Sequence, residues 1–376
     1  MPKTKLLLVV GTRPNYIKIT QFKKVASAYF KDEFEIRVVH TGQHFDASMA
    51  DVFFEQLDLQ PDYFLDIPQS SPNIQMGEVM IRLEHIIKRE FSPDLMLVPG
   101  DVNSSLAAAL TANKLKIPLG HLESGLRSFD RSMPEEINRI LIDEISDLHF
   151  VTEQSGIDNL LEEGKPKTNI FFVGNTMIDT LVAFKDRIAS QQNLDDLGIN
   201  KKEFILITLH RPATVDNQEG IELMLELITR LTNRSLVVFP MHPRTKKNIE
   251  QFNLKPRFDA LENLRILGPT DYFGFQNLIG ESKLVLTDSG GIQEETTFKG
   301  IPCITLRPNT ERPCTINQGS NCLMNFKIDS IIALVDDIIK GNYKTSEVPK
   351  LWDGSATKRI LEVISTLDIN ENRLST

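Results

Sequence analysis

Short apolar runs alternate with longer mixed stretches along most of the chain, and most of the runs end in a polar turn. Residues 6–10, 95–98 and 284–286 are such runs. Each is too short for a helix, and this pattern predicts a buried strand. Stretches of helical character follow, as at residues 15–29 and 104–114. Repeated strand–loop–helix units of this kind predict parallel sheets joined by crossover helices.

The same rhythm restarts after a polar stretch, residues 190–202. We therefore predict an α/β protein of two Rossmann-like, doubly wound domains that face a cleft, with the site in that cleft. The further strands that we expect are residues 35–40, 118–123, 148–151, 170–173, 204–208, 236–239, 264–267 and 304–306. The further helices are residues 45–57, 75–90, 135–145, 220–231, 292–298 and one that starts at 177, and residues 61–72 are expected to form a loop.

Composition narrows the class of protein. The chain has 376 residues, of which 41% are hydrophobic and 25% are charged, and its formal net charge is −9. The absence of a lysine- or arginine-rich run argues against nucleic acid as a partner. The apolar run at residues 6–10 is too short for a signal peptide, and no run approaches the length of a membrane span. The three cysteines lack metal-site spacing, so we expect a reduced, cytoplasmic protein without membrane contact.

The segment 287–295 combines a strand end, two glycines and the start of a helix. Ser289, Gly290 and Gly291 form the turn, and either Asp288 or Ser289 is placed to cap the helix. Free N–H groups and the helix dipole converge there, which is typical of a phosphate site. Glu295, one turn further on, would repel phosphate but can accept hydrogen bonds from sugar hydroxyls. The alternative is an ordinary capped helix with acidic residues in its first turn.

Charged residues follow other expected strands in both halves of the chain. Asp101, Glu123 and Glu135 are three carboxylates at strand or helix ends, and in a shared cleft they would provide a general acid and a general base. The alternative for Glu135 is a first-turn residue that complements the helix dipole. A structural role for Glu123 would need a buried cation, for which Arg127 or Arg139 is the nearest choice.

Three cations and the glycine turn suit a diphosphate, whose charge must be balanced when it binds or leaves. These cations are Arg13, Lys18 and Arg312, although Lys18 could equally be a solvated lysine on a helix. The histidines show no HxxxH or HxH pair, so we predict no metal site.

At this point the motifs resemble a known family, the non-hydrolysing UDP-N-acetylglucosamine 2-epimerases. The matching segments run in family order over most of the chain. They are Gly11-Thr12-Arg13-Pro14 with Ile17-Lys18, Thr41-Gly42-Gln43-His44, Gly100-Asp101, the segments 121–128 and 134–139, His210-Arg211, the segment 287–295, and Thr310-Glu311-Arg312-Pro313.

The resemblance implies two Rossmann-like domains in the GT-B arrangement, a homodimer, and a C-terminal helix that returns to the first domain. We accordingly place the first domain, which would carry the acid–base groups, at residues 1–174 plus 357–376. The second, at residues 175–356, would bind UDP. The implied reaction interconverts UDP-GlcNAc and UDP-ManNAc at C2, without NAD or a metal, in a polysaccharide pathway. UDP leaves to give an enzyme-bound 2-acetamidoglucal and then adds back.

The resemblance also implies a role for each matching residue. Asp101, Glu123 and Glu135 would be the acid–base set, and His210 would assist departure of the diphosphate. The UDP ligands would be Arg13, Lys18, Ser289, Gly290, Gly291, Glu295 and Arg312, with Phe275 near the uracil. Gln43, His44, Arg211 and His242 would line the cleft or a second, activating site.

The sequence departs from the family's commonest form at Asn15, at Pro212 and at Phe45-Asp46. These departures leave the exact UDP-sugar and activation by UDP-GlcNAc open. Three other functions share parts of the pattern: a hydrolysing epimerase that releases ManNAc, a GT-B glycosyltransferase, and a sensor that only binds the nucleotide sugar. Another member of the family that epimerises a related UDP-2-acetamido sugar is a fourth alternative.

Overall fold

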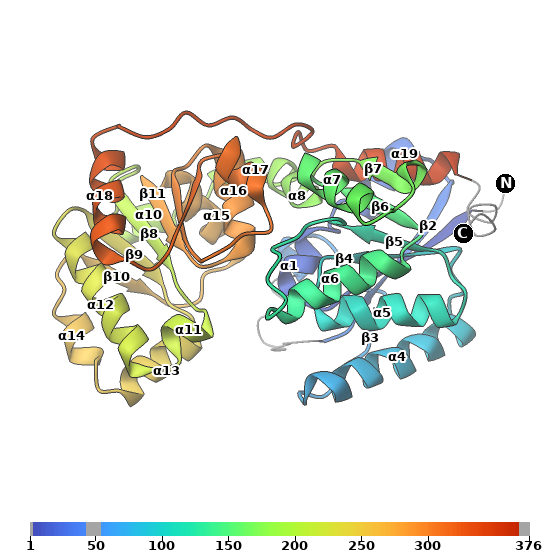
Figure 1. The fold of residues 1–376 in the computed structure, drawn as a ribbon, viewed down its shortest axis with the longest axis horizontal. Helices are drawn as coiled ribbons and strands as arrows, with labels where there is room; N and C mark the ends of the chain where they lie inside the picture. The colour runs from blue at the N-terminus through green and yellow to red at the C-terminus, as the bar shows by residue number, and fades with distance from the viewer. Residues whose placement is uncertain (1–2, 43–53, 368–376) are drawn as a thin grey trace. The chain divides into compact units, whose positions relative to one another are not determined.

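The computed structural model describes residues 3–42 and 54–367. It divides the chain into two compact units, residues 1–183 with 350–376, and residues 184–349. Each unit is built on its own parallel sheet (Figure 1). None of the helices described is both long and apolar enough to span a membrane. The predicted fold class, two doubly wound α/β domains, is confirmed.

The first unit contains a seven-stranded sheet in the order β3-β2-β1-β4-β5-β6-β7, in which all neighbours are parallel. Its strands are β1 (Thr4–Val10), β2 (Phe34–His40), β3 (Tyr63–Phe64), β4 (Leu95–Pro99), β5 (Leu119–Leu122), β6 (Leu148–Val151) and β7 (Ile170–Phe172). Its helices are α1 (Arg13–Ile17), α2 (Phe22–Tyr29), α4 (Pro72–Arg89), α5 (Asn103–Lys114), α6 (Pro134–Ile145), α7 (Gln154–Glu162), α8 (Thr176–Ala183) and α19 (Ala356–Thr366), with a 3-10 turn at Lys167–Asn169. Helix α5 packs between α4 and α6 on one face of the sheet, and α19 packs against α2 and α8 (Figure 1).

The second unit contains a six-stranded parallel sheet in the order β10-β9-β8-β11-β12-β13. Its strands are β8 (Phe204–Thr208), β9 (Leu236–Pro240), β10 (Leu264–Leu267), β11 (Leu284–Thr287), β12 (Cys303–Leu306) and β13 (Asn321–Met324). Its helices are α9 (Lys185–Ala189), α10 (Asn193–Leu197), α11 (Pro212–Val215), α12 (Gln218–Thr232), α13 (Pro243–Gln251), α14 (Lys255–Asp259), α15 (Tyr272–Glu281), α16 (Gly290–Lys299), α17 (Pro313–Asn317) and α18 (Ile328–Ile339). Because both faces are covered, the strands are almost wholly apolar, as is typical of parallel sheets.

The helix expected over residues 15–29 is broken into α1 and α2. In a continuous helix the carbonyl of Ile17 would accept a hydrogen bond from the backbone N–H of Gln21, four residues later. Here it accepts instead from the hydroxyl of Thr180 on α8, at 2.6 Å. The break leaves Lys18 just beyond α1, with its side chain buried. A long-range contact therefore overrides a local helical pattern.

The boundary between the units also differs from the expected one, because α8 lies in the first unit and not in the second. The cause is Asp179 on α8, whose carboxylate accepts from the backbone N–H groups of Ala356 and Thr357, at 3.0 and 2.6 Å. These bonds join α8 to the start of α19. The expected loop at 61–72 contains the short edge strand β3, and of the helix expected at 45–57 residues 45–53 lie outside the described part of the chain.

Candidate active site

In the first unit, the loops after β1, β4 and β5 meet at the carboxyl edge of the sheet, because parallel strands all end there. The ammonium nitrogen of Lys18 lies 2.5 Å from Glu123 Oε2, and each residue is only 6% exposed. Gly100 lies beside this pair, at a positive φ of 63°. A Cβ on Gly100 would lie 3.0 Å from Asn15 Nδ2 and 3.2 Å from Lys18 Nζ, so this close approach requires glycine.

Glu123 has a left-handed backbone, with φ of 68°. For a residue with a side chain that conformation costs about 1–2 kcal/mol. The turn is held by N–H groups of Glu123 and Ser124, which both donate to the carbonyl of Phe150 on β6. The buried cation beside this carboxylate is Lys18, whereas the sequence suggested an arginine.

The second carboxylate, Asp101, accepts from the guanidinium of Arg139 on α6, with Nε at 3.1 Å. Arg139 also donates to Glu136, at 2.7 Å. Glu136 is almost fully buried, whereas Glu135, which the sequence singled out, is exposed in the first turn of α6. Adjacent glutamates in one motif therefore have different environments, and sequence alone gave no signal for Glu136.

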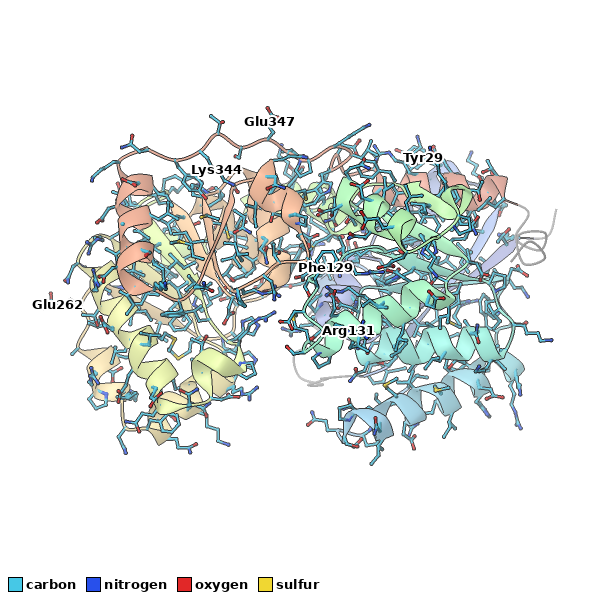
Figure 2. The ribbon with its side chains drawn as sticks, viewed as in Figure 1. Tyr29, Phe129, Arg131, Glu262, Lys344 and Glu347 are labelled. Atoms are coloured by element: carbon cyan, nitrogen blue, oxygen red, sulfur yellow. The ribbon has the colours of Figure 1, made fainter. Side chains whose placement is uncertain are left out.

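Glu136 also fixes the loop before α6. Its Oε2 accepts from the N–H of Ser128 and its Oε1 from the N–H of Phe129, both at 2.9 Å. Phe129 has a positive φ of 59° and is 78% exposed (Figure 2). A strained backbone and an exposed aromatic ring thus occur on the loop that follows Glu123.

In the second unit, the loops after β8 and β11 are joined by Asp288. Its Oδ2 accepts from the N–H groups of His210 and Arg211, at 2.9 and 2.8 Å, and its Oδ1 lies 2.9 Å from His210 Nδ1. Burial raises the pKa of Asp288, but the hydrogen bonds and charge of His210 and the N–H of Arg211 outweigh it and lower the pKa below its usual value. Asp288 therefore holds the His210 loop and does not cap α16. The residue at the N-cap is Ser289, whose side chain makes no capping bond.

The first turn of α16 lies against an ion-pair cluster. Arg312 Nε is 2.8 Å from Glu294, and the guanidinium also pairs with Glu311, which in turn lies 3.3 Å from Arg307. All four side chains are buried. A Cβ on Gly290 would lie 3.1 Å from Glu311 and 3.2 Å from Arg312, so the glycine lets the cluster approach the helix start. Arg312 thus lies beside the start of α16, where the sequence predicts an anion site, and Glu294 and Glu311 are its carboxylate partners.

Glu295, one turn into α16, is buried beside Tyr272 and Gln276 of α15. Burial raises the pKa of Glu295 from 4.5 to about 7, although the nearby side-chain amide of Gln276 and the charge of Lys299 oppose this. Phe275, on the same helix, is partly buried against the apolar core of the second unit.

The remaining candidates lie at loops and helix starts. Arg13 is the exposed first residue of α1, and the side chain of His210 is half-exposed. His242 caps α13, since its Nδ1 accepts from the N–H of Arg244 at 3.2 Å. Burial lowers the pKa of His242, as do the charges of His210 and Arg244. Gln43 and His44 lie outside the described residues. Within the described residues, no three His, Cys, Asp or Glu side chains gather as metal ligands.

Comparison with known proteins gives one consistent result. A family model described as UDP-N-acetylglucosamine 2-epimerase matches residues 28–365. The UDP-N-acetylglucosamine 2-epimerase of Methanocaldococcus jannaschii is 37% identical, over 96% of this chain and 99% of the relative. The UDP-2,3-diacetamido-2,3-dideoxy-D-glucuronate 2-epimerase of Pseudomonas aeruginosa is 38% identical, over 96% of this chain and all of the relative.

Solved structures agree. A crystal structure of the Methanocaldococcus jannaschii UDP-GlcNAc 2-epimerase with UDP-GlcNAc and UDP has a TM-score of 0.86 and 37% identity, covering 96% of this chain and 99% of that one. The Neisseria meningitidis UDP-GlcNAc 2-epimerase bound to UDP-GlcNAc has a TM-score of 0.85 and 30% identity, with coverage of 96% and 99%.

Proposed function

Since this chain belongs to the UDP-N-acetylglucosamine 2-epimerase family, we propose that it interconverts UDP-GlcNAc and UDP-ManNAc without hydrolysing the nucleotide. The observation that carries this proposal is the buried Lys18–Glu123 pair, in which a strained backbone holds a carboxylate at the end of an apolar strand. Removing the C2 proton of a sugar needs a positioned base of this kind.

The reaction has two halves in this proposal. A carboxylate takes the proton from C2 while the C1–O bond to UDP breaks, which gives 2-acetamidoglucal and UDP. Protonation of C2 on the opposite face and return of UDP to C1 then give the epimer. Glu123 and Asp101 lie on adjacent loops and are candidates for base and acid, and exposed Glu135 completes the set. Lys18 is the buried partner of Glu123, with its Nζ 2.5 Å from Oε2 of that carboxylate.

The leaving diphosphate is assigned to the second unit. The start of α16 offers N–H groups from a turn that no side chain caps, and this supports a phosphate at Ser289, Gly290 and Gly291. Arg312 and His210 would add positive charge, and the resemblance assigns Arg13 to UDP as well. Glu295 would accept from the ribose hydroxyls, and Phe275 would lie against the uracil. Arg211 and His242 are assigned to the rim of this site.

One experiment tests the proposal and its alternatives. The protein is incubated with UDP-GlcNAc in deuterated water, and the products are followed by NMR. We expect UDP-ManNAc that carries deuterium at C2. Free ManNAc would identify a hydrolysing enzyme, and unchanged substrate would favour a transferase or a sensor.

A second candidate substrate is a UDP-2-acetamido sugar with further groups. It is supported by the 38% identity to the diacetamido-glucuronate epimerase, which is as high as the identity to the UDP-GlcNAc enzymes. Parallel assays with UDP-GlcNAc and UDP-2,3-diacetamido-2,3-dideoxyglucuronate would separate the two by their kcat/KM values.

We also propose a homodimer. Helix α4 presents Ile74 and Ile81 on one outer face, 55% and 67% exposed, two turns apart. Apolar residues repeated on a solvent face favour burial against a partner. Light scattering should give twice the chain mass, and Ile74→Ser with Ile81→Ser should shift it toward the monomer.

A further inference from the structure

A buried hydrogen-bond network lies beneath the two candidate catalytic loops of the first unit, and neither the reaction nor the binding of UDP accounts for it. Its centre is Asp143, near the end of α6, which is fully buried. Asp143 accepts from His121 Nδ1 at 2.6 Å, from the N–H of Gly125 at 3.0 Å and from Arg127 Nη1 at 2.7 Å. The hydroxyl of Ser124 also donates to it.

His121 connects this centre to the other loop. Its ring is fully buried within β5, and its Nε2 lies 2.9 Å from the carbonyl oxygen of Gly100. Gly100 directly precedes Asp101, and Leu122 and Glu123 directly follow His121. One imidazole ring therefore ties the turn that carries Asp101 to the strand that ends in Glu123.

The hydrogen-bond partners of His121 indicate the protonation state of its ring. A backbone carbonyl only accepts, and an ionised carboxylate only accepts. Both bonds of His121 therefore require a hydrogen on each ring nitrogen, which makes it an imidazolium. Burial alone would raise the pKa of Asp143, but His121, His149 and Arg127 outweigh it and hold the pKa well below its usual range. Asp143 also accepts from a hydroxyl, a backbone N–H and a guanidinium, which is the pattern of an ionised, acceptor-only carboxylate.

The rest of the network is consistent with this state. Ser124 uses its only hydrogen on Asp143, so its oxygen accepts from His149 Nδ1, at 2.9 Å. Arg127 also pairs with Glu163, at 2.6 Å. The buried charges of Asp143, His121 and Arg127 thus have direct partners, and exposed Glu163 gives Arg127 a second one.

We propose that Asp143 and His121 are positioning residues for the reaction: a buried imidazolium–carboxylate pair fixes the Asp101 and Glu123 loops relative to each other. Asp143 holds the loop after β5 by Ser124, Gly125 and Arg127, and His121 carries the constraint across to Gly100. The pair is not expected to contact substrate. This inference rests on the proposed function only for its kinetic consequence, since the charge of His121 can be measured in the resting protein.

The first test is spectroscopic. In protein labelled with ¹⁵N at histidine, two-bond ¹H–¹⁵N correlation at pH 8 distinguishes an imidazolium from either neutral tautomer. His121→Gln identifies the resonance by its loss. We expect both ring nitrogens of His121 to carry hydrogen, because each of them faces an acceptor. One unprotonated nitrogen would overturn the proposal.

The second test is kinetic. In Asp143→Asn we expect kcat to fall about a hundredfold through misplaced carboxylates, while the affinity for UDP changes less than about twofold. The matched control is Asp147→Asn, because Asp147 holds the opposite end of β5 by accepting from the N–H of Leu119 at 2.8 Å. Asp147→Asn should lose stability without a comparable loss of kcat. Equal losses of kcat in both variants would mean a purely structural role and would refute the proposal.

Two outcomes would prevent the kinetic test with Asp143→Asn, and another measurement covers each of them. If Asp143→Asn does not fold, His121→Gln takes its place, since glutamine can still donate to the Gly100 carbonyl but carries no charge. Its kcat should fall at least about tenfold with unchanged UDP affinity, and an unaffected kcat would contradict the proposal. If the wild-type protein shows no epimerase activity, the proposed function fails, and the nitrogen spectrum of His121 still decides the charge of the pair.

Discussion

Glu295→Gln tests two effects of one buried carboxylate. The carboxylate should lower the stability of the folded protein, and it should strengthen the binding of UDP. Burial raises the pKa of Glu295 from 4.5 to about 7 in the folded protein. The folded state therefore binds the proton more tightly than the unfolded state does. The stability that protonated Glu295 contributes is fully present below pH 4.5, and it is lost as the pH rises through 7.

The magnitude follows from the two pKa values. A difference of about 2.5 at about 1.4 kcal/mol per pH unit corresponds to about 3 kcal/mol. Glutamine cannot ionise, so Glu295→Gln should raise the free energy of unfolding by up to about 3 kcal/mol at pH 8 and by only about 1 kcal/mol at pH 5. The same change should weaken UDP binding at least about tenfold, because a charged acceptor for ribose is lost.

The assay must report on the second unit. The only tryptophan, Trp352, packs in the first unit, where its Nε1 donates to Thr152, so its fluorescence reports on the wrong part of the chain. Circular dichroism in urea, together with hydrogen exchange of α16, measures the second unit. Calorimetry measures the affinity for UDP.

The matched control is the neighbouring glutamate. Glu294 is also buried, but it lies 2.8 Å from Arg312. Glu294→Gln should therefore destabilise the protein at pH 8, which is the opposite sign. The reasoning is refuted if Glu295→Gln lowers stability at pH 8, or if its effect is the same at pH 5 and pH 8.

Three further changes test other parts of the site. Glu123→Gln keeps the shape of the side chain but cannot take a proton, so kcat should fall about a hundredfold with UDP binding intact. NMR should detect leaked 2-acetamidoglucal if the return step is impaired more than the first step. Near wild-type turnover would exclude Glu123 as the base. Arg312→Ala should weaken UDP binding by about 1.5–3 kcal/mol. It should also destabilise the second unit by about 3 kcal/mol or more, because Glu294 and Glu311 lose their partner. An unchanged UDP affinity in calorimetry would make Arg312 purely structural. Gly100→Ala should lower the free energy of unfolding by about 1–2 kcal/mol, because Gly100 has a positive φ, and it should lower kcat by displacing Lys18. The control is Gly164→Ala, because Gly164 also has a positive φ but has open space around it. This control should lose stability without losing kcat.

The fold could be predicted because buried parallel strands leave a strong signal. Strands such as β4 and β11 are apolar on both faces and end at polar turns, so the pattern locates them within a residue or two. Helix continuity was less predictable. The break after α1 depends on Thr180, a residue 163 positions away from Ile17 in the chain. No window around residues 15–29 contains that information.

The site could be predicted to the level of which loops carry it, because parallel strands all end at one edge of a sheet. Partners within that edge could not be predicted. Lys18 pairs with Glu123 across 105 positions, and Asp288 joins the His210 loop across 78. For these two carboxylates the sequence offered a nearer arginine only as the alternative to a catalytic Glu123, and Asp288 or Ser289 as a local helix cap. The pairing depends on which side chains the folded loops bring together, and spacing along the chain does not encode it.

Backbone strain gives an independent argument about where function lies. Glu123, Gly125 and Phe129 all have positive φ within seven residues, although only one of them is a glycine. The two others cost about 1–2 kcal/mol each. The N–H of Glu123 donates to the carbonyl of Phe150 and the N–H of Phe129 donates to Glu136, and these bonds offset part of the cost. Selection for stability alone would favour glycine at positions 123 and 129. Because Glu123 is a candidate base and the ring of Phe129 is exposed on the loop that follows it, we expect substitutions in the loop after β5 to alter turnover before they alter folding.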